Sequence, residues 1–263
     1  MELIEVASGL KFPEGPIAMN DGSVILVEMF GPRITRVRPD GSKETIAEIT
    51  GGPNGAAIGP DGALYLCNNG GCFTEIDFGG LCFPGPFDKS KYSGGRIQRV
   101  DIATGAVTDL YTECEGRPLR APNDLVFDTV GGFYFTDHGI RDLEARTADF
   151  TAIYYAKADG SSIREIDFPV EGPNGIGLSP DGNTLAVISQ DALWLFSRPQ
   201  DGGDQWLSGL AKHYPFSRGA LRQLEAVTWI DDATLLLGNE QRDLFRIPLS
   251  SLPSVLPLAV PAP

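Results

Sequence analysis

The sequence predicts an all-β protein, a single β-propeller built from four-stranded blades. Short apolar segments alternate with turn dipeptides such as Asp21-Gly22, Asp61-Gly62 and Asp181-Gly182, a pattern typical of β-hairpins. These segments also group into units of roughly 40 to 50 residues, which is the repeat length of a propeller blade. The 32 glycines and 20 prolines among 263 residues disfavour long helices, and a hydrophobic content of 42% is enough for a core.

Each unit opens with a polar residue, usually in a Pro- or Gly-rich setting, followed by an apolar strand, a turn and a second strand. The opening residues are Glu14, Asn54, Asn123, Asn174 and Glu225, and the last three recur at intervals of 51 residues. The longer gap between positions 54 and 123 contains an insertion, Gly70–Gly95. The innermost strand of each blade lines the channel of a propeller, so the five opening side chains are expected to meet at one mouth.

The repeat gives five blades, whose strands can be assigned in order. The strands of the first blade are expected at Ile17–Asn20, Val24–Met29, Ile34–Arg38 and Glu44–Ile49, and those of the second at Ala56–Gly59, Ala63–Asn68, Arg96–Asp101 and Val107–Tyr111. The strands of the third blade are expected at Leu125–Asp128, Gly132–Asp137, Ala152–Lys157 and Ile163–Phe168. Those of the fourth are expected at Ile176–Ser179, Thr184–Ser189, Ala192–Phe196 and near Gln205–Leu210. The fifth blade has only Val227–Ile230, Thr234–Gly238 and Leu244–Ile247, with Glu2–Ala7 as a candidate fourth strand that closes the ring.

The remaining segments complete the domain organisation. Residues 1–250 are expected to form one propeller domain, and the Pro-rich tail 251–263 is expected to lie outside it. The one candidate for a helix longer than about two turns is Ile140–Ala148.

Charge and cysteine content limit the possible partners and location. The formal charge is −14 and no Lys/Arg cluster is present, which argues against nucleic acid or an anionic membrane and leaves a small molecule as the expected partner. No apolar run has membrane-spanning length, and the acidic N-terminus does not resemble a secretory signal, so a cytoplasmic location with reduced thiols is expected. If the protein is exported instead, Cys72 and Cys82 of the insertion are candidates for a disulfide. The oligomeric state is not predicted.

The five opening residues carry carboxylate or amide oxygens, which are hard ligands. A ring of such groups is a natural site for a divalent cation. The alternative interpretation is that the Glu-Gly and Asn-Gly steps are only turns between blades.

Three motifs in order resemble the gluconolactonase/regucalcin (senescence marker protein) family of SGL-type β-propeller lactonases. They are Phe12-Pro-Glu-Gly-Pro, Pro122-Asn-Asp-Leu-Val-Phe-Asp with Gly-Gly-Phe-Tyr-Phe-Thr-Asp137, and Gly-Pro173-Asn-Gly-Ile-Gly-Leu-Ser-Pro-Asp-Gly. The resemblance covers about residues 10–247 and implies a propeller with one divalent cation at the channel mouth. It further implies hydrolysis of sugar lactones and related esters, or of organophosphates in some members.

The resemblance also implies residue roles. Glu14 and Asn174 match two metal ligands, and Asn123 matches a channel residue near metal and substrate. The third ligand normally stands in Pro-Asp-Gly, whereas here the sequence is Leu224-Glu225-Ala226, so Glu225 takes that role with a longer side chain. The family is typically six-bladed, which differs from the five blades counted here.

These assignments predict a mechanism. The cation, Ca²⁺ in the first place and otherwise Mg²⁺, Mn²⁺, Zn²⁺ or Fe²⁺, would activate water and the lactone carbonyl. Glu225 is the expected catalytic base and Asn123 the group that stabilises the oxyanion. Asn123, Asn54 and His138 are the expected substrate contacts, although His138 also fits a structural role. A non-catalytic binding module, and a metal-dependent isomerase or lyase, are the alternatives. The aromatic-rich insertion is either a lid or substrate wall, or a loop that packs on its own blade.

Overall fold

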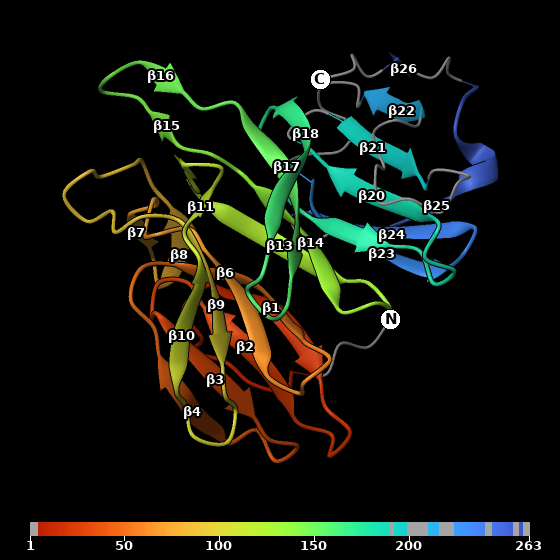
Figure 1. The fold of residues 1–263 in the computed structure, drawn as a ribbon. Helices are drawn as coiled ribbons and strands as arrows, with labels where there is room; N and C mark the ends of the chain where they lie inside the picture. Colours follow the sequence, from red (N-terminus) through yellow and green to blue (C-terminus); the bar gives the residue numbers. More distant parts are fainter. Residues whose placement is uncertain are drawn as a thin grey trace. The chain divides into compact units, whose positions relative to one another are not determined.

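Figure 1 shows the computed structural model of the chain, which consists mainly of β-strands. The structure describes residues 5–189, 192–198, 210–215, 224–239, 244–254 and 258–259. Within these ranges the only helix is a single 3-10 turn, η1 (Leu249–Ser251). No helix in this part of the chain is long and apolar enough to cross a membrane.

The chain forms two compact units, each of which is described by itself. The first comprises Met1–Asp124 with Gly139–Asp149, and the second comprises Leu125–His138 with Phe150–Pro263. The chain passes from the first unit to the second within strand β13 (Pro122–Phe127). The division into a domain 1–250 and a tail 251–263 stays a prediction.

The first unit contains two four-stranded antiparallel sheets. In each sheet the strands lie side by side in the order in which they occur along the chain. The first sheet has the order β1 (Pro13–Ala18), β2 (Val24–Glu28), β3 (Arg33–Val37) and β4 (Lys43–Glu48). The second has the order β5 (Pro53–Ile58), β6 (Leu64–Asn68), β9 (Arg96–Val100) and β10 (Val107–Tyr111). Three small hairpins pair β7 (Glu75–Phe78) with β8 (Leu81–Pro84), β11 (Glu113–Cys114) with β12 (Arg117–Pro118), and β15 (Arg141–Asp142) with β16 (Thr147–Ala148).

The sheets of the second unit are also antiparallel, and apart from β26 their neighbouring strands follow one another along the chain. The third sheet consists of β13, β14 (Gly132–Asp137), β17 (Thr151–Lys157) and β18 (Ile163–Val170). The fourth consists of β19 (Ile176–Leu178), β20 (Thr184–Ile188), β21 (Ala192–Ser197), β22 (Leu210–Pro215) and β26 (Leu258–Ala259). The fifth consists of β23 (Leu224–Asp231), β24 (Thr234–Asn239) and β25 (Leu244–Pro248).

The second strands of three sheets are almost continuously apolar because they are buried on both faces. The strands β2, β6 and β20 read VILVE, LYLCN and TLAVI, and nearly every residue in them is buried. The outer strands β4 and β10 read KETIAE and VTDLY, and their residues are mostly exposed. The predicted second and third strands of all five blades are confirmed within one or two residues at each end.

The Asp-Gly dipeptides form the predicted turns. In the first of them, the Asp21 carboxylate accepts hydrogen bonds from the Ser23 backbone N–H at 3.0 Å and from its hydroxyl at 2.6 Å. Gly22 has a φ of 79°, a conformation that favours glycine. Asp40 and Ser42 repeat this arrangement. These residues are therefore structural, as the sequence indicates.

One expected element is wrong, and another is not a strand in the part of it that the structure describes. Residues 140–148 do not form a helix but the β15–β16 hairpin, whose turn is fixed by a hydrogen bond from the Ala145 N–H to the Asp142 carboxylate. Residues 5–7 are not part of a strand, and residues 1–4 lie outside the described ranges. In the described part of the chain, the fifth sheet therefore has three strands and no N-terminal fourth strand.

A buried carboxylate fixes the N-terminal segment to the first sheet in place of strand pairing. Glu28 is 1% exposed and accepts hydrogen bonds from the Lys11 backbone N–H at 2.7 Å, from Arg33 Nε at 2.8 Å and from the Thr35 hydroxyl at 2.6 Å. Burial alone would raise the pKa of Glu28, but these hydrogen bonds outweigh it and lower the pKa to about 2. Lys43 adds a hydrogen bond to the Ser8 carbonyl at 2.7 Å.

The fourth sheet also differs from expectation. Its fourth strand is Leu210–Pro215 rather than a segment near 205–210, of which residues 205–209 lie outside the described ranges. Leu258 and Ala259 of the tail pair with β22, although the tail was expected to lie outside the sheets.

Candidate functional site

The five opening residues occupy equivalent positions in their sheets. Each lies at or just before the start of the first strand, which is an edge strand of its sheet: Glu14, Asn54, Asn123 and Glu225 are the second residues of β1, β5, β13 and β23, and Asn174 precedes β19 by two positions. Of the three Glu-Gly and Asn-Gly steps, Glu14-Gly15 and Asn54-Gly55 lie inside strands, so their interpretation as turns between blades is wrong.

A β-bulge accompanies the polar residue in three of these strands. The pairing register shifts between Glu14 and Ile17 in β1, between Pro53 and Ala56 in β5, and from Leu224 to Ala226 in β23. A bulge turns the side chain next to it relative to the regular pleat, and bulges are over-represented beside active sites. The same local irregularity thus marks the position that the repeat singles out.

The glycines after the polar residues allow close approach of neighbouring first strands. A Cβ atom on Gly15 would lie 2.6 Å from the Ala56 backbone nitrogen, and one on Gly55 would lie 2.6 Å from the Asn123 carbonyl oxygen. In the second unit, a Cβ on Gly175 would lie 2.6 Å from the Glu225 carbonyl oxygen. Only glycine fits at these contacts, so the Glu-Gly and Asn-Gly steps have a packing reason that the sequence alone does not show.

In the first unit, the site residues are Glu14, Asn54 and Asn123. Glu14 is half-buried, while Asn54 and Asn123 are only 8% and 7% exposed. The side-chain amides of the two asparagines make no hydrogen bond to any other described residue. Buried amides are normally hydrogen-bonded, so these two groups are suited to contact a ligand.

In the second unit, the structure brings Asn174 and Glu225 together. The Asn174 amide Nδ2 donates a hydrogen bond to the Glu225 carboxylate, and the Gly175 backbone N–H donates to the Glu225 carbonyl at 2.9 Å. The backbone of Asn174 is held by its N–H, which donates to the Ile188 carbonyl at 2.7 Å. Both side chains are half-buried. These bonds fix the orientation of an amide and a carboxylate that the motif predicts to act together.

Thr136 supports this pair and was not found from the sequence. Its hydroxyl donates a 2.6 Å hydrogen bond to the Asn174 carbonyl. Thr136 is fully buried in β14, and the half-buried His138 follows that strand. Only the tertiary structure could connect residues 136 and 174, which are far apart in the sequence.

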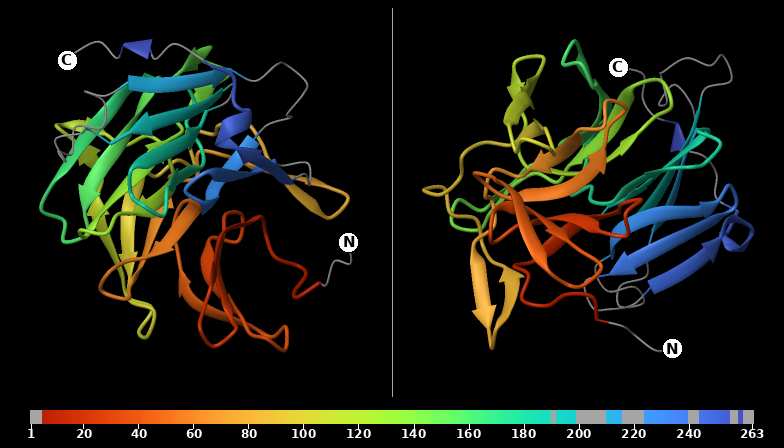
Figure 2. Two further views of the ribbon diagram at one scale, coloured as in Figure 1. Left: turned by 90° about the vertical axis from the view of Figure 1, so that its right-hand side faces the viewer. Right: turned by 90° about the horizontal axis from the view of Figure 1, so that it is seen from below.

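The insertion has two parts with different surroundings. Phe73, Phe87 and Tyr92 pack against a buried cluster of the first unit that contains Ala121 and Ile140, so this part of the insertion packs on residues outside the sheet of its own blade. The β7–β8 hairpin stands out from the sheets of this unit in Figure 2, and its Phe78 is 77% exposed. Ile76 pairs with Phe83 across the hairpin, so these aromatic and aliphatic side chains share one exposed face. The base is anchored and the tip is available for contacts.

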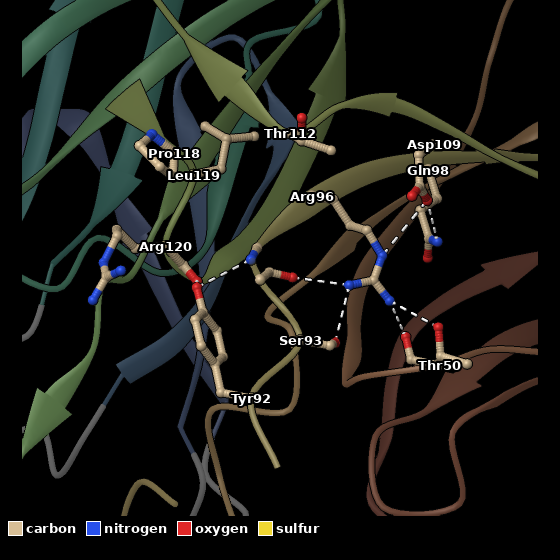
Figure 3. A pocket seen from close by; sticks show the side chains of 12 residues that line it. Thr50, Tyr92, Ser93, Arg96, Gln98, Asp109, Thr112, Pro118, Leu119 and Arg120 are labelled. Atoms are coloured by element: carbon tan, nitrogen blue, oxygen red, sulfur yellow. Dashed lines mark hydrogen bonds and ion pairs between the residues drawn. The ribbon is translucent and has the colours of Figure 1, made fainter. Parts of the chain in front are cut away.

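Arg96 ties the end of the insertion to the segment before Asn54. As Figure 3 shows, its buried guanidinium donates to Ser93 Oγ at 3.2 Å, to the Gly94 carbonyl at 2.8 Å and to the Thr50 hydroxyl at 3.0 Å. Burial lowers the pKa of Arg96. These residues line a cavity of about 430 Å³. The sequence analysis did not identify Arg96, because nothing in its local pattern separates it from a surface arginine.

Asn68 completes this support. The side-chain Oδ1 of Asn68 accepts hydrogen bonds from the Gly52 and Gly70 backbone N–H groups at 3.1 and 2.9 Å. Its side-chain Nδ2 donates a hydrogen bond to Gln98 Oε1 at 2.9 Å. Asn68 thereby fixes both the turn before Asn54 and the start of the insertion.

The cysteines are all free. Cys67, Cys72 and Cys114 are buried, and Cys82 is half-buried with its thiol 2.9 Å from a Glu75 carboxylate oxygen. The structure therefore shows no bond between Cys72 and Cys82, the pair considered for an exported protein.

Residues 12–219 match the family described as the SMP-30/gluconolactonase/LRE-like region. Among curated relatives, the chain is 25% identical over 220 residues to the gluconolactonase of Zymomonas mobilis, a match that covers 75% of this chain and 55% of that protein. It is 30% identical over 185 residues to lactonase drp35 of Staphylococcus saprophyticus, with coverage of 68% and 48%. The chain thus matches about half the length of these relatives.

Solved structures show the fold. The chain is similar to a gluconolactonase from Xanthomonas campestris with a TM-score of 0.65 and 20% identity, covering 94% of this chain and 79% of the other. It is also similar to virginiamycin B lyase from Staphylococcus aureus, with a TM-score of 0.56, 14% identity and coverage of 92% and 71%. The predicted fold class, an all-β propeller of small sheets, is confirmed.

Proposed function

Because the chain belongs to the SMP-30/gluconolactonase/LRE-like family, we propose that it is a hydrolase that opens lactones, either sugar lactones or related cyclic esters. The observation that carries this proposal is the hydrogen bond from the Asn174 amide to the Glu225 carboxylate, at equivalent positions of two neighbouring sheets. The named activities of the gluconolactonase and lactonase relatives support the same reaction class.

We propose Glu14, Asn174 and Glu225 as the residues that would hold one divalent cation. Two carboxylates and one amide oxygen are suitable hard ligands for Ca²⁺, and also for Mg²⁺ or Mn²⁺, with Zn²⁺ and Fe²⁺ as further alternatives. Among the described residues, no group of three or more His, Cys, Asp and Glu side chains lies close enough together to hold a metal ion, and the proposed set includes an amide oxygen. The hydrogen bond from Nδ2 holds the Asn174 amide in a fixed orientation, as a ligand residue requires. When bound, the cation would polarise the lactone carbonyl and make water more acidic.

The chain's own residues supply the remaining steps. The Glu225 carboxylate accepts a proton from the attacking water as the new C–O bond forms. The Asn123 amide donates a hydrogen bond to the carbonyl oxygen while that atom carries negative charge. The ring C–O bond then breaks, and the proton held by Glu225 passes to the leaving ring oxygen, which gives a hydroxy acid. Asn54 and His138 contact the substituents of the ring and orient it.

The insertion extends the proposed substrate range toward apolar lactones. The hairpin follows β6, whose last residue Asn68 pairs with Pro53, so the insertion starts at the same end of the second sheet as Asn54. Its exposed face of Ile76, Phe78 and Phe83 offers apolar contact to a ring substituent.

The test is the hydrolysis of glucono-δ-lactone by the purified chain, followed by acid release and corrected for spontaneous opening. We expect Glu14→Gln to lower kcat/KM at least about 100-fold, with loss of the bound cation. The matched variant Glu48→Gln removes the same charge from an exposed position in β4 and should retain full activity. Ligand binding by the wild-type chain without turnover across a panel of lactones and esters would instead favour the binding-module alternative. Equal activity of both variants would contradict the assigned site.

A further inference from the structure

A second cavity lies at the end of the first two sheets opposite to Asn54. Its volume is about 520 Å³, a size suited to a small molecule. Its wall includes the Asp61-Gly62 turn, which joins β5 to β6 at the end of β5 remote from Asn54. All its lining residues belong to the first unit, and none of them is part of the proposed active site.

Arg36 distinguishes this cavity. It is half-buried, and its Nε atom is buried without a hydrogen-bond partner. Within the described residues, the Arg36 guanidinium forms neither a hydrogen bond nor an ion pair. An unpaired guanidinium at a partly buried position is unfavourable, because it loses hydration without a compensating anion.

The other charged groups in the cavity wall are already paired. Glu44 accepts from Arg38 at 2.5 Å, and Asp61 forms an ion pair with Arg99 at 2.7 Å. Asp101 accepts from the Thr104 backbone N–H at 2.8 Å and from its hydroxyl at 3.0 Å. Among the described lining residues, Arg36 is therefore the one charged side chain that forms no hydrogen bond or ion pair; its Coulombic attraction to Asp21, which helps to lower the pKa of that carboxyl, leaves its N–H donors unused. These donors can bind an anion from outside the chain.

The three carboxylates restrict what that anion is. Each ionised carboxylate has lone pairs for about four hydrogen bonds. Asp61 already contacts Ala63, Tyr65 and Arg99, whereas Glu44 and Asp101 retain the capacity to accept from hydroxyl groups. Two guanidiniums against three carboxylates leave the wall with one net negative charge, which disfavours a dianion such as phosphate. A ligand with a single carboxylate and several hydroxyl groups satisfies both requirements.

We propose that this cavity binds a polyhydroxylated monocarboxylate, with its carboxylate on Arg36 and its hydroxyls on the surrounding acidic side chains. The choice of ligand rests on the proposed function, since opening a sugar lactone produces this class of compound. The site is separate from the one that would carry out the reaction.

Calorimetric titration of the full chain with gluconate tests the proposal. We expect Arg36→Gln to weaken gluconate binding at least tenfold. Because the Arg36 guanidinium forms no hydrogen bond or ion pair and is unfavourable where it is buried, its replacement should not lower the thermal midpoint. Arg117→Gln removes the same charge from an exposed arginine of the β11–β12 hairpin and should bind gluconate as the wild type does. Sorbitol, which has the hydroxyls without the carboxylate, should not compete.

The outcomes separate this site from the proposed active site. Gluconate binding that survives Glu14→Gln but not Arg36→Gln supports the proposal, whether or not the chain hydrolyses lactones. Binding that survives Arg36→Gln but not Glu14→Gln assigns gluconate to the active site and overturns it. Absence of gluconate binding, or equal binding of acetate or inorganic phosphate, also overturns it.

Discussion

Gly175→Ala tests whether the close approach of two first strands positions the site. The added Cβ would lie 2.6 Å from the Glu225 carbonyl oxygen and 2.8 Å from both the Ala226 Cα and the Val227 nitrogen. All three are backbone atoms, so no side chain can move aside to relieve the contact. Gly175 does not have a positive φ, and the substitution therefore introduces no conformational strain of its own.

The expected magnitude follows from two opposing terms. Overpacking costs about 1–3 kcal/mol, with the upper end appropriate to a backbone contact. The loss of glycine flexibility in the unfolded chain returns about 0.4–1 kcal/mol. The net destabilisation is about 2 kcal/mol, which lowers the thermal midpoint by about 4–8 °C for a chain of this size. Displacement of β19 also separates Asn174 from Glu225, so kcat/KM for a lactone should fall at least about tenfold.

Gly238→Ala is the matched control in the same unit. Its nearest contact would be the Ala226 Cβ at 3.8 Å, an ordinary van der Waals distance, and Gly238 also lacks a positive φ. This variant should be at least as stable as the wild type and fully active. Thermal melts and lactone assays of the two variants decide the matter. If Gly175→Ala melts and turns over like Gly238→Ala, the packing argument for the glycines is wrong.

Four further predictions address individual side chains. Glu225→Gln should lower kcat/KM for glucono-δ-lactone at least about 100-fold, whereas the exposed Glu171→Gln should not; similar rates for both would exclude Glu225 as the base. The lowered pKa of Glu28 contributes about 3 kcal/mol to the free energy of unfolding, which is present above pH 4.5 and is lost as the pH falls toward 2. Glu28→Gln should therefore flatten the acid limb of the curve of stability against pH. An unchanged acid limb would count against this role of Glu28. Burial raises the pKa of Asp167 to about 6, so its charge destabilises the fold increasingly between pH 3.8 and 6 and fully above that range. Asp167→Asn should therefore raise the thermal midpoint at pH 8 and not at pH 4. A gain at both pH values would refute the explanation. Phe78→Ser should lower kcat/KM only for lactones with alkyl substituents, while an equal loss with gluconolactone would argue against an apolar wall.

Part of the fold could be predicted from local patterns. The buried second strands are short apolar runs between Asp-Gly turns, and both signals are local, so their positions followed directly. The first strands begin earlier than predicted, because Pro13-Glu14-Gly15-Pro16 has the composition of a turn. Its place in a strand depends on a bulge and on the close packing of Gly15 against Ala56, which are tertiary features.

The site shows the same division between local and tertiary information. The repeat located Asn174 and Glu225, since equivalent positions of a repeated unit carry the same kind of side chain. It did not locate Thr136 or Arg96, whose partners come from distant segments. The missing hydrogen-bond partner of Arg36 Nε was equally beyond local patterns, because an unused donor is recognised only when its surroundings are known.

The most direct test of the proposed function is the rate of glucono-δ-lactone opening by the purified chain before chelation, after chelation and after Ca²⁺ is returned. Our account predicts that turnover disappears with the chelator and recovers as about one cation binds per chain. Turnover that is indifferent to the chelator would contradict the assignment of Glu14, Asn174 and Glu225 as cation ligands, and its absence in every state would contradict the lactonase itself.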